Sequence, residues 1–315
     1  MPKKYWIISL CVALGMVFLA GLSVWYAKVR SGLNRRGEYT FAQTRQKAAL
    51  LQKVKLSTAD DELEIYDNGG EWRIKEAADY FADAGQLASF YKMINNSVIV
   101  AVAEVQKDKL AEYGLDKEHK TLVETFDAEG NLLDKVALGG GYADGEYRFV
   151  MLNGFPYVYS ISEAGGFSGE AGDWMPFPLF EIPTSQVSRI TVSAGAFVPE
   201  NFLPETANSK KMKEFLGALL YMNYNGIALK KDFMADFAKI ESHKIMAETK
   251  IGLIYNLEVY KTAADDYWLA VELGSSRLPR KEVTLFVENN QKYFADWVFN
   301  LDDEQGKILY DFTGK

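Results

Sequence analysis

The sequence predicts an α+β protein in which an N-terminal transmembrane helix precedes two tandem homologous α+β repeats with antiparallel sheets. Three observations support this: an uncharged apolar run near the start, strand-length segments that alternate apolar and polar residues, and a residue pattern that recurs 125 positions later. Long alternation of strands and helices, which would indicate a parallel sheet, does not occur in the sequence. With 315 residues, 48% of them hydrophobic, the chain is long enough for two domains.

The predicted anchor is the uncharged run YWIISLCVALGMVFLAGLSVWYA, residues 5–27. As a helix it would measure roughly 34 Å, enough for a hydrocarbon core of about 30 Å. Aromatic residues stand at both ends, as they do at membrane interfaces. A cleaved signal peptide would have a shorter apolar core and a small residue where the sequence has Trp25. The run therefore predicts an uncleaved, single-pass signal anchor.

Charge is divided unevenly along the chain. Residues 1–56 contain ten basic residues and one acidic residue, whereas the rest contains 25 basic and 42 acidic residues. The acidic body argues against a nucleic-acid partner, because phosphate binding needs a positive face. The basic segment lies where it can contact anionic lipid head groups. More lysine and arginine follow the anchor than precede it, so a simple count by the positive-inside rule would place the large domain in the cytoplasm. A short N-terminal stub is also easily retained inside, so the charges leave the orientation open.

Five segments follow from these patterns. They are an anchor at 1–30, a basic connector at 31–59, a first α+β repeat at 60–163, a Gly/aromatic-Pro linker at 164–184 and a second α+β repeat at 185–315. The connector is expected to form a short basic helix around residues 41–53. Each repeat is expected to contain a hairpin, an amphipathic helix, a short second helix and a run of antiparallel strands.

The first repeat has recognisable local signals. ELEIY alternates as a half-buried strand does, and DNGG indicates a turn before a second strand. A helix is expected after Asp83, a residue type that favours helix N-termini. Its apolar residues share one face: Leu87, Phe90, Met93 and Ile94.

A shift of 125 residues brings the second repeat onto the first. The matched pairs are Trp72 with Phe197, Asp83 with Asn208, Leu87 with Met212, Phe90 with Phe215, and Ile94 with Leu219. Further on, LAEYGL from Leu110 matches MADFAKI from Met234, VALGG from Val136 matches VELGS from Val271, and Tyr157 falls on Tyr293. Because caps, core residues and turns recur in the same order, the sequence predicts two copies of one unit.

The segment from Trp72 to Ile94, followed by LAEYGLD and VALGGG, resembles a bacterial membrane-anchored family known only as a domain of unknown function. Members are usually encoded beside ABC transporters of the gliding-motility type. The resemblance is carried by Trp72, Asp83, Tyr113-Gly114-Leu115 and Gly139-Gly140. The second copy departs from the pattern, with Phe197 for the tryptophan and Phe237-Ala238-Lys239 for YGL. The resemblance implies the bacterial inner membrane, a periplasmic bulk of the chain and an ABC transporter as neighbour, and it implies no catalytic residues.

Residues suited to catalysis or metal binding are scattered. The two histidines, His119 and His243, are expected at the surface, because a metal site needs several ligands held together. The carboxylate clusters are expected in solvated turns: Asp60–Glu62, Asp265–Asp266 and Asp302–Glu304. A carboxylate-dependent hydrolase, the weakest hypothesis, would need two of these acids to converge in a concave site.

Glycine and cysteine patterns do not indicate a reaction either. GGGYADG from Gly139 predicts a tight turn or bulge, with glycines for positive φ, since neither a Lys-Ser/Thr pair nor a helix follows it as in a phosphate loop. The single cysteine, Cys11, lies in the anchor and can form no internal disulfide. We therefore expect a non-enzyme that has no cofactor and no metal.

The linker supplies the candidate partner-binding residues, which lie among three prolines: Trp174, Met175, Phe177, Leu179 and Phe180. So much apolar surface needs cover, so the alternatives are a partner-docking strap or a filled seam between the repeats.

The predicted function is that of a non-catalytic, membrane-anchored accessory or scaffold subunit of an ABC-type export system, contacting its permease and ATPase subunits. The alternative is an extracytoplasmic module that binds a glycan or lipid in the cleft between the repeats. Such a cleft would be lined by Trp72, Tyr113, Tyr157 and their counterparts in the second repeat.

Overall fold

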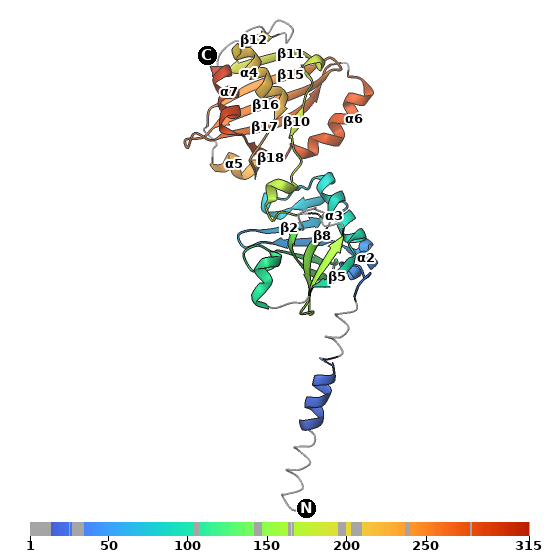
Figure 1. The fold of residues 1–315 in the computed structure, drawn as a ribbon. Coiled ribbons are helices and arrows are strands. Elements are labelled where there is room, and N and C mark those ends of the chain that lie inside the picture. Colours follow the sequence, from blue (N-terminus) through green and yellow to red (C-terminus); the bar gives the residue numbers. More distant parts are fainter. Residues whose placement is uncertain are drawn as a thin grey trace, which may run out of the picture. The chain divides into compact units, whose positions relative to one another are not determined.

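The computed structural model describes residues 14–24, 26, 35–103, 107–141, 147–162, 165, 167–194, 200–202, 210–236, 240–277 and 279–314 (Figure 1). The chain forms two compact units. The first unit comprises Met1–Asp67 and Gly85–Glu170, and the second comprises Asn68–Ala84 and Ala171–Lys315. The chain therefore passes between the units three times.

The first unit is built around an antiparallel sheet. Its elements are α2 (Ala42–Gln46), η1 (Ala48–Leu50), β1 (Lys53–Ser57), β2 (Glu62–Asp67), α3 (Ala84–Asn96), β5 (Ile99–Ala103), η3 (Lys107–Tyr113), β6 (Thr121–Phe126), β7 (Leu132–Gly141), β8 (Tyr147–Leu152) and β9 (Val158–Ser162). Across the sheet the strands of this unit follow the order β2-β1-β6-β7-β8-β9-β5. The antiparallel pairing predicted from the sequence is confirmed.

The predicted amphipathic helix after Asp83 is present as α3. It buries Phe90, Met93 and Ile94, three of the four residues predicted on its inner face, and Leu87 is half-buried. The Phe90 ring meets the Phe167 ring edge to face, with centroids 5.3 Å apart. The helical period of the sequence thus identified a part of the core of this unit.

Alternation along the strands gives the first sheet a charged outer face. The register places four residues of alternating charge side by side, from β2 to β7: Glu64, Lys55, Glu124 and Lys135. The Lys135 Nζ atom lies 2.8 Å from Glu124 Oε1, and the Lys53 Nζ atom lies 3.5 Å from Glu64 Oε2. Each cation of this face is therefore matched by an anion on the neighbouring strand.

The short helix expected around 41–53 is present in part, as α2 and η1, whereas residues 53–57 of the expected connector form β1. The helix α2 is short, and β1 begins at Lys53 inside the sheet because KVKLS alternates and buries Val54 and Leu56. Thr44 fastens α2 to β7, since its backbone N and its Oγ1 both donate to Asp134 Oδ2 at 2.7 Å.

The predicted bulge is present at the GGG stretch, but Gly139 and Gly140 do not have the positive φ expected of them. The pairing of β7 with β8 is irregular between Leu138 and Gly141, as expected of a bulge. Gly139, however, lies within β7, and a Cβ atom on it would stand 2.4 Å from the Tyr113 carbonyl oxygen. Gly114 has φ +62°, and its Cβ would stand 2.7 Å from the Gly140 backbone nitrogen. The YGL and GGG stretches are thus two backbones in close contact, a packing that only glycine permits.

The second unit has a second antiparallel sheet. Its elements are β3 (Trp72–Ile74), η2 (Lys75–Ala77), β4 (Tyr80–Phe81), η4 (Ala171–Trp174), β10 (Phe180–Glu181), η5 (Thr184–Gln186), β11 (Val187–Ala194), β12 (Glu200–Phe202), α4 (Lys210–Leu220), β13 (Tyr221–Met222), β14 (Gly226–Leu229), α5 (Lys230–Asp236), β15 (Ser242–Thr249), β16 (Leu253–Lys261), β17 (Tyr267–Ser275), α6 (Lys281–Asn290), η7 (Gln291–Tyr293), β18 (Trp297–Asn300) and α7 (Asp303–Gly314). The main sheet has the order β12-β11-β15-β16-β17-β18-β14, and β10 pairs with β13.

Helices cover both faces of this sheet. On one face lie α4 and α7 (Figure 1), joined by the stacked rings of Phe215 and Phe312, whose centroids are 3.9 Å apart. The amide of Gln305 on α7 donates to the Ala218 and Tyr221 carbonyl oxygens, which would otherwise lack partners at the end of α4. On the other face α5 places Phe233 against Tyr260 and Ala270.

The seven strands of the first unit follow the same order as the main sheet of the second unit, with β2, β1, β6, β7, β8, β9 and β5 at the places of β12, β11, β15, β16, β17, β18 and β14. The sequence match of Phe90 with Phe215 pairs two buried helix residues, and so does the match of Ile94 with Leu219. The match of VALGG with VELGS pairs strands that do not correspond. VALGG lies in β7, whose counterpart by strand order is β16, whereas VELGS lies in β17. The matched residues Phe197, Asn208 and Phe237–Lys239 lie outside the described residues.

Only part of the predicted anchor lies within the described residues. Residues 14–24 are helical, and their large apolar side chains are 42–71% exposed: Leu14, Met16, Val17, Phe18, Leu19, Leu22 and Val24. Among the described residues no helix has both the length and the apolar character needed to cross a membrane. Most of the remainder of 5–27, including Cys11, is outside them.

The contact between YGL and GGG can be tested by adding one methyl group. Gly139→Ala should lower the free energy of unfolding by about 2 kcal/mol or more, because the new Cβ overlaps the Tyr113 carbonyl oxygen. Denaturant unfolding followed by circular dichroism measures the change. The control is Gly172→Ala, whose Cβ would meet nothing within 4 Å. Equal stability of the two variants would contradict the close contact.

Candidate functional site

The structure separates the five candidate partner-binding residues into buried and accessible ones. They lie on the strap, defined here as residues 171–181, which includes η4 and β10. Trp174, Met175 and Phe180 are buried, Leu179 is half-buried, and Phe177 is 62% exposed. Of the five, Phe177 therefore offers the accessible apolar surface of the strap.

Hydrogen bonds fix the strap on both sides of Phe177. The Trp174 carbonyl oxygen accepts from the backbone N–H of Asp83 at 2.6 Å, and the Pro176 carbonyl oxygen accepts from the Tyr224 hydroxyl at 2.6 Å. Phe180 pairs with Met222 in the small sheet. A strap held at these points presents Phe177 in one place rather than on a loose loop.

A second feature of the unit is the inserted hairpin, defined here as residues 68–84. The DNGG turn predicted from the sequence is confirmed, with φ +71° at Gly69 and +93° at Gly70. The turn leads into β3, which pairs with β4 through Arg73 opposite Phe81 and Ile74 opposite Tyr80. This hairpin precedes the first unit's α3 in the sequence, yet it packs in the second unit.

Aromatic rings hold the inserted hairpin. Tyr80 is 2% exposed and meets Trp297 and Phe299 edge to face, with centroids 5.1 and 5.7 Å away. Phe81 meets Tyr293 at 4.4 Å in the same manner. Burial raises the pKa of the Tyr80 hydroxyl well above its ordinary range, so this side chain stays neutral in the cluster.

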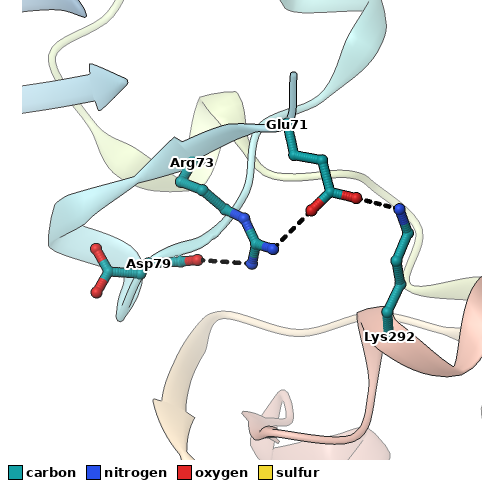
Figure 2. A network of polar contacts seen from close by, with 4 residues as sticks. All are labelled: Glu71, Arg73, Asp79 and Lys292. Atoms are coloured by element: carbon teal, nitrogen blue, oxygen red, sulfur yellow. Dashed lines mark hydrogen bonds and ion pairs between the residues drawn. The ribbon is translucent and has the colours of Figure 1, made fainter. Parts of the chain in front are cut away.

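Arg73 joins the polar part of the hairpin to its aromatic part (Figure 2). Its guanidinium carbon lies 3.6 Å from the centroid of the Phe81 ring, a cation–π distance. One terminal nitrogen donates to Glu71 Oε2 at 2.8 Å and the other to the Asp79 carbonyl oxygen at 3.2 Å. Figure 2 shows the Asp79 carboxylate turned away, so it is the backbone of Asp79 that is recognised.

The turn between η2 and β4 has a strained backbone, and its carbonyl oxygens accept hydrogen bonds from two side chains. Ala78 and Asp79 have φ +53° and +57°, a left-handed conformation that costs a residue with a side chain about 1 kcal/mol. The Trp297 indole N–H donates to the Ala78 carbonyl oxygen at 2.9 Å, and Arg73 donates to that of Asp79. Two side chains thus hold two consecutive strained residues in place.

Glu71 and Lys292 form the outer end of the network, where the Lys292 ammonium donates to Glu71 Oε1 (Figure 2). This hydrogen bond lowers the pKa of the Glu71 carboxyl and raises the pKa of the Lys292 ammonium. Lys292 comes from η7, so the contact links the hairpin to the end of α6. The network thus joins β3, the turn after η2 and η7 through hydrogen bonds from Arg73 and Lys292 to the Glu71 carboxylate and the Asp79 carbonyl oxygen.

One histidine is where the sequence predicted it and the other is not. The His119 side chain is 64% exposed and its Nδ1 lies 2.7 Å from Asp116 Oδ1. His243 is only 4% exposed, which contradicts the surface prediction, because it points inward from β15 and stacks on the Tyr310 ring at 3.9 Å. Within the described ranges, the ligand atoms of Asp116, Glu118 and His119 lie within 4.8 Å of one another.

The carboxylate clusters are exposed, as predicted, although Glu62 begins β2 and Asp303 and Glu304 lie in α7 rather than in turns. Asp302 Oδ1 accepts from the backbone N–H of Glu304 at 2.9 Å and so caps α7. Asp265 has φ +68° in a turn and pairs with Lys261 at 2.9 Å. Each of these two carboxylates has a structural role at the surface.

The residues proposed to line a cleft do not gather within one unit. Tyr113 and Tyr157 belong to the first unit, where Tyr113 meets Phe149 at 4.7 Å and Tyr157 meets Tyr159 at 6.3 Å. Trp72 belongs to the inserted hairpin of the second unit and is half-buried. Their role in ligand binding stays a prediction.

The fold places the chain in the class of α+β proteins with antiparallel sheets. It belongs to the family known as domain of unknown function DUF4340, whose model matches residues 72–238, more than half of the chain. The matched range begins at Trp72, contains the YGL and GGG stretches and ends just after α5. The resemblance to a domain of unknown function is thereby confirmed. No curated protein and no solved structure matches the chain.

The hydrogen bond to the strained turn should be measurable. Trp297→Phe should lower the free energy of unfolding by about 2 kcal/mol, from the lost hydrogen bond and the smaller buried ring. Denaturant unfolding measures it. Trp268→Phe is the matched control, because Trp268 is half-buried and packs on Phe233. A loss for Trp268→Phe as large as that for Trp297→Phe would contradict the role given to the indole N–H.

The Glu71–Lys292 pair should make stability depend on pH. Since the Glu71 pKa is lowered on folding, its contribution is present above the ordinary value of 4.5 and is lost as pH falls through the folded value. Since the Lys292 pKa is raised, its contribution is present below 10.5 and is lost as pH rises through the folded value. The stability difference between wild type and Glu71→Gln should therefore be largest between these limits.

Thermal unfolding between pH 3 and pH 11 measures this difference. Lys292→Gln should show the same profile, and the double variant Glu71→Gln/Lys292→Gln should add little to either single change. Additive losses across the whole range would contradict a direct pair.

Proposed function

We propose that this protein is a non-catalytic, membrane-anchored accessory or scaffold subunit of an ABC-type export system. Its anchor would pack beside the permease, and its two units would hold a partner or cargo outside the bacterial inner membrane. The transporter as partner follows from the resemblance of its Trp72, YGL and GGG motifs to proteins encoded beside such exporters.

The observation that carries the proposal is the helix at residues 14–24. Its apolar side chains are exposed at successive positions rather than along one stripe, from Leu14 to Val24. A helix that is apolar all round needs an apolar environment on every side, and lipid supplies one. The uncharged sequence continues on both sides of this segment to 5–27.

The scaffold role is supported by the repeated sheet order. We infer that the two units are tandem homologous repeats, because both sheets share one strand order and their amphipathic helices bury matched residues. Duplication of a non-catalytic unit provides two related surfaces on one chain. Such an arrangement suits an adaptor between a transporter and what it moves.

Phe177 is the residue we propose for partner contact. It is 62% exposed on a strap that hydrogen bonds hold on both sides of it, so the ring is presented at little cost in ordering the loop. Aromatic side chains held in this way are common anchors of protein interfaces.

The test is extraction of the tagged, full-length protein from its native membrane in mild detergent, followed by mass spectrometry of the bound proteins. We expect an ABC permease and its ATPase at a fixed ratio. Exchange of residues 5–27 for an unrelated transmembrane helix should release them. Phe177→Asp should weaken their recovery, whereas the control Ile251→Asp, at another exposed apolar position, should not.

Recovery of the protein alone would overturn the transporter proposal. The alternative would then be examined by adding glycan and lipid fractions to the chain, and saturable binding of either would identify a ligand-binding module. If Phe177→Asp leaves the recovery of the transporter unchanged, the subunit role stands and the strap is not part of the interface.

A further inference from the structure

The outer face of the second sheet contains a hollow of about 200 Å³ over β15, β16 and β17. Its polar lining comes from four strands and the start of α5: Thr191, Lys230, Lys244, Asn256, Glu258 and Glu272. It lies wholly in the second unit, away from the face that α4 and α7 cover. The proposed transporter contact makes no use of it.

The strand register explains how the hollow forms. On the outer face Lys244, Glu258 and Ala270 lie side by side in one row, and Met246, Asn256 and Glu272 form the next. Cross-strand neighbours stand about 5 Å apart, so Ala270 leaves a gap among longer side chains. Glu258 lies directly across from that gap, and Glu272 lies two residues along β17.

The floor and one wall are fixed by packing. Ala270 is 5% exposed in a cluster with Phe233, Tyr260 and Val298, and the Phe233 ring meets the Tyr260 ring edge to face at 5.5 Å. The Ser242 hydroxyl donates to Glu258 Oε1 at 2.6 Å, which orients that carboxylate. Packing and this hydrogen bond therefore fix the floor of the hollow and one carboxylate of its rim, while Lys244 and Glu272 are exposed at its edge.

On the charged face of the first sheet, oppositely charged side chains on neighbouring strands form close ion pairs. At the places of β15 and β16 stand β6 and β7, where Glu124 and Lys135 are 2.8 Å apart. In the second sheet the corresponding pair, Lys244 and Glu258, is 3.9 Å apart, with Lys244 70% exposed. The second sheet thus has a longer and more exposed ion pair at the edge of the hollow, where the first sheet has a closer one.

We infer that this hollow binds a small zwitterion, an α-amino acid or a short peptide with free ammonium and carboxylate groups. Two lysines and two glutamates line it, so a ligand of one charge sign would meet repulsion as well as attraction. The carboxylates of Glu258 and Glu272 would receive the ammonium, and Lys230 and Lys244 would receive the carboxylate. A volume below the range of about 300–1,000 Å³ for drug-sized ligands fits one or two residues.

The test is isothermal titration calorimetry of the full-length protein in detergent with L-alanine, L-glutamate, L-lysine and alanyl-alanine. Saturable binding of at least one is expected below about 10 mM. N-acetyl-alanine lacks the ammonium group and alaninamide lacks the carboxylate, so each should bind at least about tenfold more weakly than the corresponding zwitterion.

Variants locate the site. Glu272→Gln and Lys244→Gln change exposed side chains and should each weaken binding about tenfold without altering the unfolding temperature. Ala270→Leu fills the hollow and should abolish binding. The matched control is Glu124→Gln on the charged face of the first sheet, which should leave affinity unchanged.

Three results would overturn the inference. They are a lack of saturable binding by every zwitterion, equal affinity for the blocked and free compounds, and unchanged affinity in both Glu272→Gln and Lys244→Gln. None of these outcomes bears on co-purification with a transporter, so the two proposals fail independently.

Discussion

The docking of the inserted hairpin in the second unit is the constraint on which the chain's organisation depends. Arg73 spans it, with its guanidinium over Phe81 and its N–H groups on Glu71 and the Asp79 backbone. Because residues 68–84 interrupt the first unit's sequence, the chain must leave that unit and return before it can finish the sheet. The second unit therefore cannot complete its aromatic cluster from residues 171–315 alone, and the two units are tied by three chain passages rather than one linker.

Periodicity and repetition predicted much of the architecture. The helical period identified Phe90, Met93 and Ile94 as buried, and the turn signal DNGG gave the two positive-φ glycines. The helix face and the turn are both features of a short stretch of sequence. The predicted match of VALGG with VELGS is wrong by one strand. Short alternating strands that end in glycine resemble each other, so sequence similarity alone does not determine which strand of a meander is matched.

The rest depends on contacts distant in sequence. The local sequence WRI does not indicate that Arg73 will lie over the Phe81 ring and bind Glu71. Nor does it indicate that the Ala78 carbonyl oxygen will accept a hydrogen bond from Trp297, which is 219 residues away. His243 was expected in water because its neighbours are polar, yet alternation along β15 turns it inward onto Tyr310. The roles of Gly139 and Gly114 come from a close contact between two backbone segments that are distant in sequence. A single sequence contains the residues for such contacts, but not their pairing.

Equal strand order with unequal surface chemistry suggests a division of roles between the units. On the first sheet, alternating charges neutralise each other from Glu64 to Lys135, which removes the driving force to bind a charged partner there. On the second sheet, Ala270 interrupts the row and leaves Glu258, Glu272 and two lysines facing a hollow. Ala270 itself packs with Phe233, Tyr260 and Val298, so the floor of the hollow is part of the core of this unit. The charged rim above this floor is where we infer ligand binding, on the same unit as the inserted hairpin and the strap.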